Sequence, residues 1–218
     1  MPEYLGPTYS LTEIEAVAHS NGYPTSQPDD LLPVIARCIA NGHIVGRFDG
    51  SAEFGPRALG NRSILVDPRR PGMKDYLNSR VKHREAFRPF APTVLEEYAG
   101  EWFDLSGRSS YMLRVVPILP DKIDKIPAVA HVDGTARVQT LASHENPGYY
   151  QLIRTFHELT GVPLVLNTSF NIAGKPIVEK PEDALECFEK TEIDILVMGP
   201  YIISKQSLEY YLNTNSSA

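Results

Sequence analysis

Residues His43 to Val66 read H-I-V-G-R-F-D-G-S-A-E-F-G-P-R-A-L-G-N-R-S-I-L-V. The apolar and β-branched ends predict one strand over 43–48 and another over 63–66. Between the strands lie three glycines and a proline, which allow tight turns and close approach of the backbone to a ligand. Arg57 and Arg62 add guanidinium groups, which bind two phosphate oxygens at once. The segment therefore predicts a strand–loop–strand unit whose loop binds phosphate.

A tight turn without a ligand is the structural alternative for the same loop. Arg57 or Arg62 would then form a salt bridge with Glu53 or Asp67. This alternative explains either arginine alone better than it explains both on one glycine-flanked loop.

Positive charge is concentrated in one stretch of an acidic chain. Residues 47–88 carry ten Lys and Arg against five Asp and Glu, a net charge of +5. The remainder has eleven Lys and Arg against twenty-two acids, a net charge of −11. Such a local cationic region indicates a small, phosphate-rich ligand. The overall charge of −6 makes nucleic acid an unlikely partner, because nucleic-acid binding requires a basic face on the whole domain.

The general class is an α/β protein of one main domain. With 218 residues the chain can bury a sizeable core. Neither a membrane helix nor a signal peptide is evident, so no membrane partner and a cytoplasmic location are expected. Cys38 and Cys187 fall on apolar faces of expected helices, which favours buried thiols in a reducing compartment. We interpret residues 1–28 as a lead-in or linker from a missing N-terminal domain, and residues 29–218 as the domain itself.

Helices and strands alternate irregularly, which predicts a mixed sheet with flanking helices. We expect helices over 11–20, 31–39, 72–80, 147–159 and 182–191. We expect strands over 43–48, 63–66, 90–95, 111–118, 164–166, 195–198 and 201–204, and a hairpin that joins 127–131 to 135–141 around Asp133-Gly134. Thr12 and Glu15 could form a capping box at the start of the first helix.

Three further groups of residues could contribute to a binding site. Lys82, Arg84 and Arg88 precede Pro89, which favours an extended chain with these cations on one face; a solvated basic strand edge is the alternative. Asn167 to Asn171 follow a buried strand, where ligands collect in α/β sheets, although a plain turn also fits. Arg137 and Gln139 share one face of an expected strand. His131 and Asp133 have a spacing that could hold a metal, but a hairpin corner explains them better.

Together these segments resemble one known family. F-G-P-R-A-L-G-N-R-S-I-L, V-K-H-R-E-A-F-R-P-F-A-P, H-V-D-G-T-A-R-V-Q-T and V-P-L-V-L-N-T-S-F-N, followed by K-P-I-V-E-K-P-E-D-A, are similar to the C-terminal domain of O-carbamoyltransferases of nodulation-factor and antibiotic biosynthesis. The likeness runs in order from about Gly42 to Ser204. It implies a YrdC-like fold, a twisted mixed sheet with a concave nucleotide site.

The resemblance also implies which residues act and on what. A Lys-x-Arg pair and a Ser-x-Asn pair line the pocket of YrdC-like proteins, and they correspond here to Lys82 with Arg84 and Ser169 with Asn171, which we expect to be catalytic. Contacts to substrate are implied for Arg57, Arg88, Arg137 and Asn167, to which the loop and strand patterns add Arg62 and Thr168. The substrates would be ATP, with Mg²⁺, and carbamoyl phosphate, which together give carbamoyladenylate. No residue is expected to bind a metal directly.

In the family a separate N-terminal domain of the Kae1-like fold transfers the carbamoyl group to a hydroxyl. The chain is therefore expected to be a carbamoyltransferase that performs the activation half-reaction and is incomplete by itself. Two other functions fit the pattern. One is the threonylcarbamoyladenylate step of tRNA modification, which uses the same Lys-x-Arg and Ser-x-Asn pairs. The other is a non-catalytic nucleotide-binding module that regulates a partner.

Overall fold

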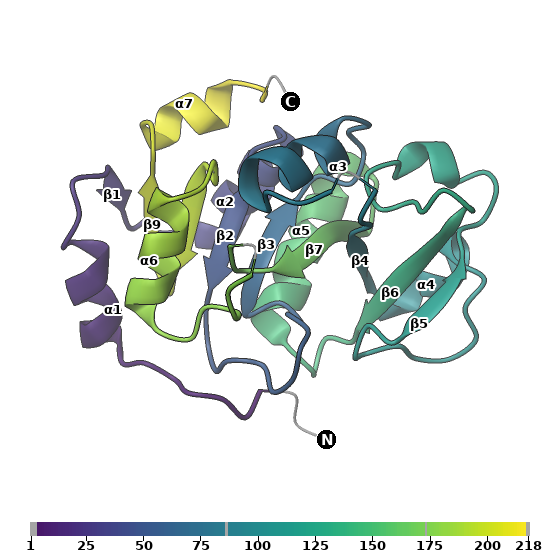
Figure 1. The fold of residues 1–218 in the computed structure, drawn as a ribbon, viewed down its shortest axis with the longest axis horizontal. Helices are drawn as coiled ribbons and strands as arrows, with labels where there is room; N and C mark the ends of the chain where they lie inside the picture. Colours follow the sequence, from purple (N-terminus) through teal and green to yellow (C-terminus); the bar gives the residue numbers. More distant parts are fainter. Residues whose placement is uncertain (1–3, 86, 173, 217–218) are drawn as a thin grey trace.

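A single mixed sheet forms the centre of the molecule (Figure 1). The computed structural model describes residues 4–85, 87–172 and 174–216. Within them the strand order is β1-β9-β8-β2-β3-β7-β4-β6-β5. The strands are β1 (Thr25–Ser26), β2 (Val45–Phe48), β3 (Arg62–Val66), β4 (Ala91–Leu95), β5 (Arg114–Pro117), β6 (Thr135–Leu141), β7 (Leu164–Ser169), β8 (Ile195–Met198) and β9 (Tyr201–Ser204).

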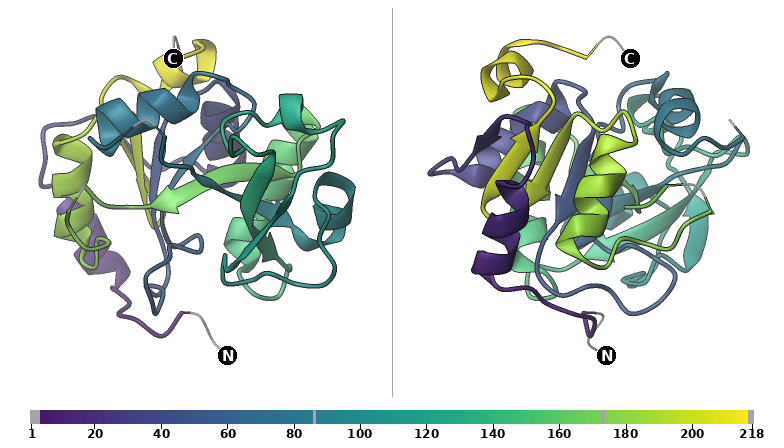
Figure 2. Two further views of the ribbon diagram at one scale, coloured as in Figure 1. Left: turned by 45° about the vertical axis from the view of Figure 1, so that its right-hand side comes forward. Right: turned by 60° about the vertical axis from the view of Figure 1, so that its left-hand side comes forward.

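Helices cover both faces of this sheet (Figures 1 and 2). They are α1 (Leu11–Ala18), α2 (Leu31–Ala40), α3 (Met73–Tyr76), α4 (Ala99–Trp102), α5 (Pro147–Thr160), α6 (Pro181–Glu189) and α7 (Leu208–Asn213). Helices α2 and α5 pack against each other behind the sheet, while α6 lies in front of β2 and β8 and contacts α1. The central strands β2, β3 and β8 are buried along their whole length, so the core runs through the middle of the molecule.

The sheet is mixed, as the sequence predicts. β2 pairs with β8 and β4 pairs with β6 in parallel, and the other neighbouring strands are antiparallel. β3 and β7 lie side by side at the centre, with Ser63 opposite Ser169. This pairing matters for the site, because it brings the loop before β3 next to the end of β7. The expected turn motif after residue 166 is therefore part of a strand, since β7 continues to Ser169.

The hairpin expected around Asp133-Gly134 does not form, because the strand that pairs with β6 is not the predicted one. Residues 127–129 lie in turns and residues 130–131 are irregular, and β6 pairs instead with β5 in antiparallel fashion and with β4 in parallel. The turn itself is correct: Gly134 has a φ of 77°, and its amide donates to the His131 carbonyl oxygen at 3.0 Å. β5 is shorter than the expected strand over 111–118, and α7 is an element that the sequence analysis did not predict.

The described part of the lead-in is integrated into the fold. α1 buries Ile14, Val17 and Ala18, and β1 adds an antiparallel strand to β9. The capping box of α1 is formed by Ser10 and Glu13 and not by Thr12 and Glu15, because Ser10 directly precedes the first helical residue and is therefore the N-cap. The family-implied missing domain before this segment stays a prediction.

The segment that carries Lys82 and Arg84 is not extended. A π-helical turn (Leu77–Val81) follows α3, and bends then continue to Arg84, with His83 at a φ of 45°. The backbone amides of Lys82 and Arg84 donate to the Leu77 and Asn78 carbonyl oxygens. The expectation that Lys82, Arg84 and Arg88 share one face of a strand is therefore wrong, and helical hydrogen bonds direct these cations separately.

The fold requires a glycine at position 60, which precedes β3. Its φ is 126°, and a Cβ at this position would overlap the ring of the buried Tyr149. Gly55, in the same loop, has a φ of 119° but open space around its would-be Cβ. We expect Gly60→Ala to lower the free energy of unfolding by about 2–5 kcal/mol, because strain and overlap add. Gly55→Ala adds strain alone and should cost about 1–2 kcal/mol. Urea unfolding of both variants tests this, and equal losses would contradict the overlap.

Candidate functional site

The β2–β3 loop (residues 49–61) is held in place by the carboxylate of Glu53. Its Oε1 atom accepts hydrogen bonds from the backbone amides of Leu59, Asn61 and Arg62 at 2.8, 2.7 and 3.1 Å. These amides lie at the entry to β3, where they would otherwise need water or another acceptor. Glu53 thus folds the glycine-rich segment back on itself. Asp67, the other acid considered as a partner, pairs with Arg69 at 2.7 Å, so neither acid neutralises Arg57.

Arg62 is held by groups of this loop, and its predicted contact with substrate stays a prediction. Its side chain is fully buried and stacks over the Phe48 ring, 3.6 Å from the ring centroid. The guanidinium donates to the carbonyl oxygens of Asp49 and Gly50 at 2.7 and 3.2 Å. Burial lowers the pKa of Arg62 to about 10. Because Arg62 binds two carbonyl groups of the loop, it fixes the loop against β2.

Arg47 supports the loop from the neighbouring strand. It is buried and donates to the Gly60 carbonyl oxygen at 2.6 Å and to Asn61 Oδ1 at 3.1 Å. Its second terminal nitrogen pairs with Asp49 at 2.5 Å. The high density of cations in residues 47–88 is thus partly structural, since Arg47, Arg62 and Arg69 all satisfy groups of the protein itself.

A buried polar network joins the loop to three strands. Asn167 of β7 donates to the Ala58 carbonyl oxygen at 3.2 Å, and Gln139 of β6 donates to the Leu59 carbonyl oxygen at 3.1 Å. Thr93 of β4 connects them, because it donates to Gln139 at 2.7 Å and accepts from Asn167 at 3.0 Å. Asn167 is therefore a residue that positions the loop, and its Oδ1 atom is buried without a hydrogen-bond partner.

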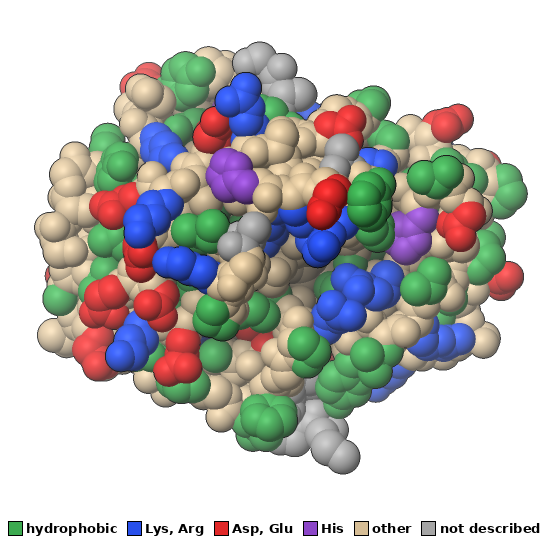
Figure 3. All heavy atoms as spheres, in the orientation of Figure 1, with side chains coloured by type: hydrophobic (Ala, Val, Ile, Leu, Met, Phe, Trp, Pro, Cys, Tyr) green, Lys and Arg blue, Asp and Glu red, His purple; other side chains and the backbone are tan. Residues whose placement is uncertain are grey.

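Arg57, Arg84 and Arg137 meet in one small cavity of about 90 Å³, which we call the arginine cavity. Its walls come from the β2–β3 loop, from residues 84–91 and from β6 and β7, and they include Thr168 and Ser169. Figure 3 shows Lys and Arg side chains gathered in a hollow in the middle of this face. Residues from five separate parts of the sequence, Met112 included, thus converge at one point.

The charges in the arginine cavity are not compensated by the protein. Nε of Arg57 and Nε of Arg137 are buried and have no hydrogen-bond partner among the described residues. Burial, then the charges of Arg57 and Arg84, lower the pKa of Arg137. Arg84 donates to Asn78 at 2.7 Å and stacks over Phe90, so it is fixed as well. The described lining of the arginine cavity thus holds three guanidinium groups close together and no acid, an arrangement that suits an anion.

Lys82, Ser169 and Asn171 form a second cluster beside the arginine cavity. The ammonium group of Lys82 donates to the Ser169 carbonyl oxygen, and to Oδ1 and the carbonyl oxygen of Asn171 at 2.8 and 3.2 Å. Ser169 Oγ donates to Asn171 Oδ1 at 2.7 Å. Burial, followed by the charge of Arg84, lowers the pKa of Lys82 to about 7. Lys82 therefore fixes the end of β7, and Ser169 at this end also lines the arginine cavity.

The other predicted residues are placed as follows. Thr168 is half-buried and lines the arginine cavity, whereas Arg88 lies outside its lining and pairs with Glu85 at 3.0 Å, with 54% of its side chain exposed. His131 and Asp133 both contact the Thr135 hydroxyl, as expected for a hairpin corner. No group of three metal-binding side chains was found among the described residues. Cys38 and Cys187 are buried, free thiols.

Mg²⁺ does not fit the wall of the arginine cavity as a resident ion. The described residues that line it include three arginines and no carboxylate, whereas Mg²⁺ is bound by carboxylates and phosphates. A divalent cation would therefore arrive on the phosphates of a nucleotide, as part of the substrate.

Sequence reasoning missed the residues that hold the loop. Glu53 and Gln139 hydrogen-bond to the loop, and Thr93 donates to Gln139, so these three residues help to position Arg57. Gln139 was noted only as a neighbour of Arg137 on one face of the strand. A single signal could have indicated Glu53: it is an acid inside a glycine-rich loop with two arginines. Thr93 carries no such signal, because a threonine in a strand is ordinary.

Fold and site together define an α/β domain with a cationic ligand cavity on one face of its sheet. Residues 36–205 match the family model described as "Carbamoyltransferase C-terminus". The chain belongs to this carbamoyltransferase C-terminal family. The resemblance drawn from the four sequence motifs is thereby confirmed.

Several curated proteins are similar over nearly the whole chain. Nodulation protein NolO of Bradyrhizobium diazoefficiens is 44% identical, over 93% of this chain and 38% of NolO. Nodulation protein NolNO of Sinorhizobium fredii is 45% identical, over 94% of this chain and 31% of NolNO. An uncharacterized protein of Synechocystis is 43% identical, over 93% of this chain and 37% of its own length. The chain thus spans about a third of the length of these relatives.

Among solved structures, full-length HypF in the phosphate- and nucleotide-bound form has a similar fold. The TM-score is 0.57 at 17% sequence identity, over 81% of this chain and 26% of that HypF chain. This likeness shows the fold alone, and it confirms the YrdC-like mixed sheet with flanking helices. In the part of the chain that the structure describes, no helix is both long and apolar enough to cross a membrane.

Proposed function

We propose that this domain binds ATP and carbamoyl phosphate and forms carbamoyladenylate. The observation that carries the proposal is the arginine cavity, where two buried guanidinium nitrogens lack partners among the described residues, in a chain of the carbamoyltransferase C-terminal family. Such fixed cations suit a reaction in which negative charge develops on phosphate groups. Arg57, Arg84 and Arg137 would bind the phosphates, and Ser169 and Asn171 would orient the reacting group beside them.

The proposed reaction has two steps, each with one bond broken and one bond formed. Carbamoyl phosphate and water first give carbamate and phosphate, as the bond between the carbamoyl carbon and the phosphate oxygen is broken. An oxygen of carbamate then attacks the α-phosphorus of ATP, and pyrophosphate leaves with the electron pair of the broken bond. The arginines would neutralise the charge on pyrophosphate, with Mg²⁺ carried by the ATP. The carbamoyl group would finally be transferred to a hydroxyl by a Kae1-like partner domain.

The test is release of pyrophosphate by the purified chain in the presence of ATP, Mg²⁺ and carbamoyl phosphate. We expect pyrophosphate and AMP, because free carbamoyladenylate hydrolyses when no hydroxyl acceptor is supplied. Arg57→Ala should reduce the rate of pyrophosphate release strongly. Arg154→Ala should not, because Arg154 is an exposed arginine on α5. Pyrophosphate that depends on threonine and not on carbamoyl phosphate would indicate tRNA modification chemistry instead. ATP binding without any turnover would support a regulatory module.

A second experiment addresses the division of labour. We expect the chain alone to transfer no labelled carbamoyl group to sugar or hydroxymethyl acceptors, and a separately expressed N-terminal domain of a relative to restore transfer. Product formed by this chain alone would contradict the proposal that another domain performs the transfer. The cytoplasmic location, which the sequence analysis predicts, stays a prediction.

A further inference from the structure

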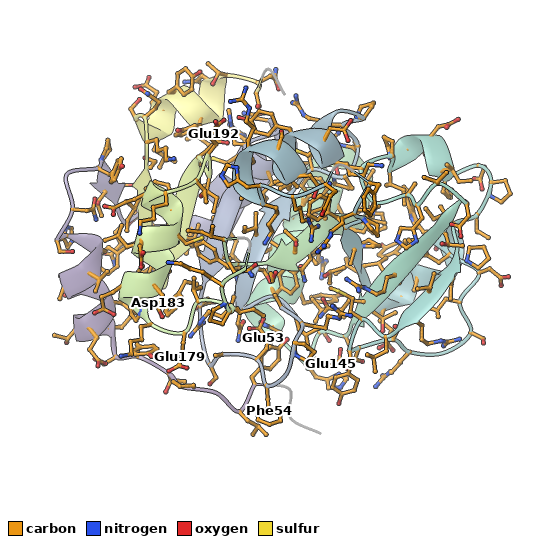
Figure 4. All side chains as sticks on the ribbon, in the orientation of Figure 1. Glu53, Phe54, Glu145, Glu179, Asp183 and Glu192 are labelled. Carbon is orange, nitrogen blue, oxygen red and sulfur yellow. The ribbon has the colours of Figure 1, made fainter. Side chains whose placement is uncertain are left out.

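A second cavity, which we call the α7 cavity, lies beside α7. Its volume is about 310 Å³, at the lower end of the range of about 300–1,000 Å³ that is usual for small-molecule sites. Its walls come from α3, α7 and the segments that flank β8 and β9. Figure 4 shows Glu192, a wall residue, at the top near α7, and Glu53 and Phe54 in the lower half. The described linings of the α7 cavity and of the arginine cavity share no residue.

Two opposite charges in the α7 cavity are held apart from each other. Asp194 Oδ2 accepts a hydrogen bond from the Ile44 amide at 2.7 Å, and the ammonium group of Lys205 donates to the Thr191 carbonyl oxygen. In the part of the chain that the structure describes, no ion pair joins Asp194 to Lys205. Burial raises the pKa of the Asp194 carboxyl group and lowers that of the Lys205 ammonium group. Both charged forms are therefore poorly solvated and lack a close partner of opposite charge.

The other acid in the wall, Glu192, is already compensated. Its Oε1 atom pairs with Arg80 at 3.2 Å, and its Oε2 atom accepts from the Tyr76 hydroxyl at 3.1 Å. One negative and one positive charge therefore remain in the described wall of the α7 cavity. Because buried charges are stabilised by partners of opposite sign, a ligand that carries both charges fits this wall better than a simple cation or anion.

His43 indicates where the positive end of such a ligand binds. Its side chain is buried, and its Nε2 atom donates to the Thr214 carbonyl oxygen at 2.8 Å. Since a carbonyl oxygen can only accept, Nε2 carries the proton, and Nδ1 of the neutral ring is an acceptor. Nδ1 faces Asp194 Oδ2 at 4.0 Å. Two acceptors that face each other need a donor between them, and an ammonium group with three N–H donors can bind both.

Tyrosine rings complete the wall beside His43. The Tyr211 ring centroid lies 4.8 Å from that of His43, and the Tyr210 ring lies 5.3 Å from Tyr211. Tyr210 is 49% exposed, although a side chain of this size usually packs against other groups. The α7 cavity therefore offers ring surface for an apolar part of a ligand, next to the two charges.

We propose that the α7 cavity binds a free α-amino acid. The ammonium group of the amino acid donates to Asp194 and to His43 Nδ1. Its carboxylate accepts from Lys205, which has three N–H donors and uses one on the Thr191 carbonyl oxygen. Its side chain packs on the exposed ring of Tyr210. This site is independent of the arginine cavity, so the inference does not rest on the proposed binding of ATP.

Thermal unfolding and calorimetry of the wild-type chain test this assignment. Unfolding is measured with each of the protein amino acids in turn, and we expect at least one of them to raise Tm, because a ligand of the folded state stabilises it. Calorimetry then compares that amino acid with its N-acetyl derivative, which lacks the ammonium group, and with its amide, which lacks the carboxylate. Both derivatives should bind roughly 10- to 100-fold more weakly, because each loses charge-assisted hydrogen bonds.

Variants assign the two ends of the ligand. Asp194→Asn keeps an oxygen for the Ile44 amide but loses the charge, so it should no longer prefer the amino acid over its N-acetyl derivative. Lys205→Gln keeps a donor but loses the charge, so it should no longer prefer the amino acid over its amide. Asp121→Asn and Lys190→Gln are the matched controls, because both residues are exposed and pair elsewhere. The comparison of derivatives on the wild-type chain stands even if a variant fails to fold.

Each other outcome overturns the inference. If no amino acid raises Tm, the α7 cavity is not a site for this class of ligand. If the amide binds as tightly as the amino acid, the cavity binds amines and Lys205 takes no part. If the N-acetyl derivative binds as tightly, the ammonium group is not recognised. If Tm rises equally in Asp194→Asn and in the wild type, the amino acid acts at another place or through the solvent.

Discussion

Replacing Arg137 with glutamine is expected to weaken ATP binding by about 10- to 100-fold and to leave the protein no less stable. The loss follows because a charge-assisted hydrogen bond contributes about 1.5–3 kcal/mol. The stability should hold because Arg137 has no acid partner among the described residues, and because burial, then the charges of Arg57 and Arg84, lower the pKa of its guanidinium. Glutamine retains much of the side chain's packing while it removes the charge.

Calorimetry with ATP and urea unfolding measure the two effects on the same preparation. Arg154→Gln is the matched control, because Arg154 is an exposed arginine that pairs with Glu158 on α5. It should change neither quantity by more than a small amount. A parallel loss of stability and binding in Arg137→Gln would mean that Arg137 is a structural residue like Arg62. Unchanged ATP binding would remove Arg137 from the site.

Replacing Lys82 with methionine is expected to abolish most adenylate formation and to remove a pH dependence of ATP binding. Lys82 orients Ser169 and Asn171, and methionine cannot donate to their carbonyl oxygens. The buried acceptors then lack a donor, so a loss of about 1–3 kcal/mol in stability should accompany the loss of activity. Pyrophosphate release should fall by roughly 100-fold or more, since both positioning and charge are lost.

The sign of the pH dependence follows from the pKa of Lys82. Burial lowers this pKa to about 7 in the folded chain, against an ordinary value of 10.5. An anion bound nearby raises it again, so binding takes up a proton above pH 7, and ATP affinity falls as the pH rises from 7 to 9. Below pH 7 the lysine is already charged, and this dependence disappears.

The same shift affects stability in the opposite sense. Because the folded chain binds this proton less tightly than the unfolded chain, protonated Lys82 favours the folded state less than neutral Lys82 does. The free energy of unfolding therefore rises between pH 7 and pH 10.5, as the proton is lost. Calorimetry of ATP binding to the wild type and to Lys82→Met at several pH values isolates the effect of Lys82 on affinity, because the titration of ATP itself is common to both proteins. The same slope in both proteins would show that Lys82 is not the titrating group.

The sequence alone determined the class of fold and the central elements. Strand patterns placed β2, β3, β8 and β9 within two residues of their observed ends, because these strands are buried throughout and rich in apolar residues. Gly161 ends α5 in the left-handed conformation, as a C-terminal glycine should. The motifs also predicted that Arg57, Arg137 and Ser169 belong together, and they line one cavity.

Tertiary structure decided which cations line the arginine cavity and which are held by groups of the protein itself. Arg57 and Arg62 stand five residues apart in one motif, yet one points into the cavity and the other is buried over Phe48. No local pattern separates them, because the difference arises from the pairing of β2 with β3 and from the carbonyl groups that the loop presents. The partner of β6 was likewise decided by long-range pairing with β5, which competes with the local hairpin.

The positions of Lys82 and Glu53 were beyond local reasoning for the same physical cause. Lys82 contacts Ser169, which lies 87 residues further along the chain. Glu53 contacts backbone amides of residues 59–62, which fold back onto it. Only closure of the sheet brings these groups together. Residue type and spacing therefore determined which charged and polar groups this chain carries. The register of β3 against β7 determined where these groups meet, because it places the loop arginine beside the end of the strand.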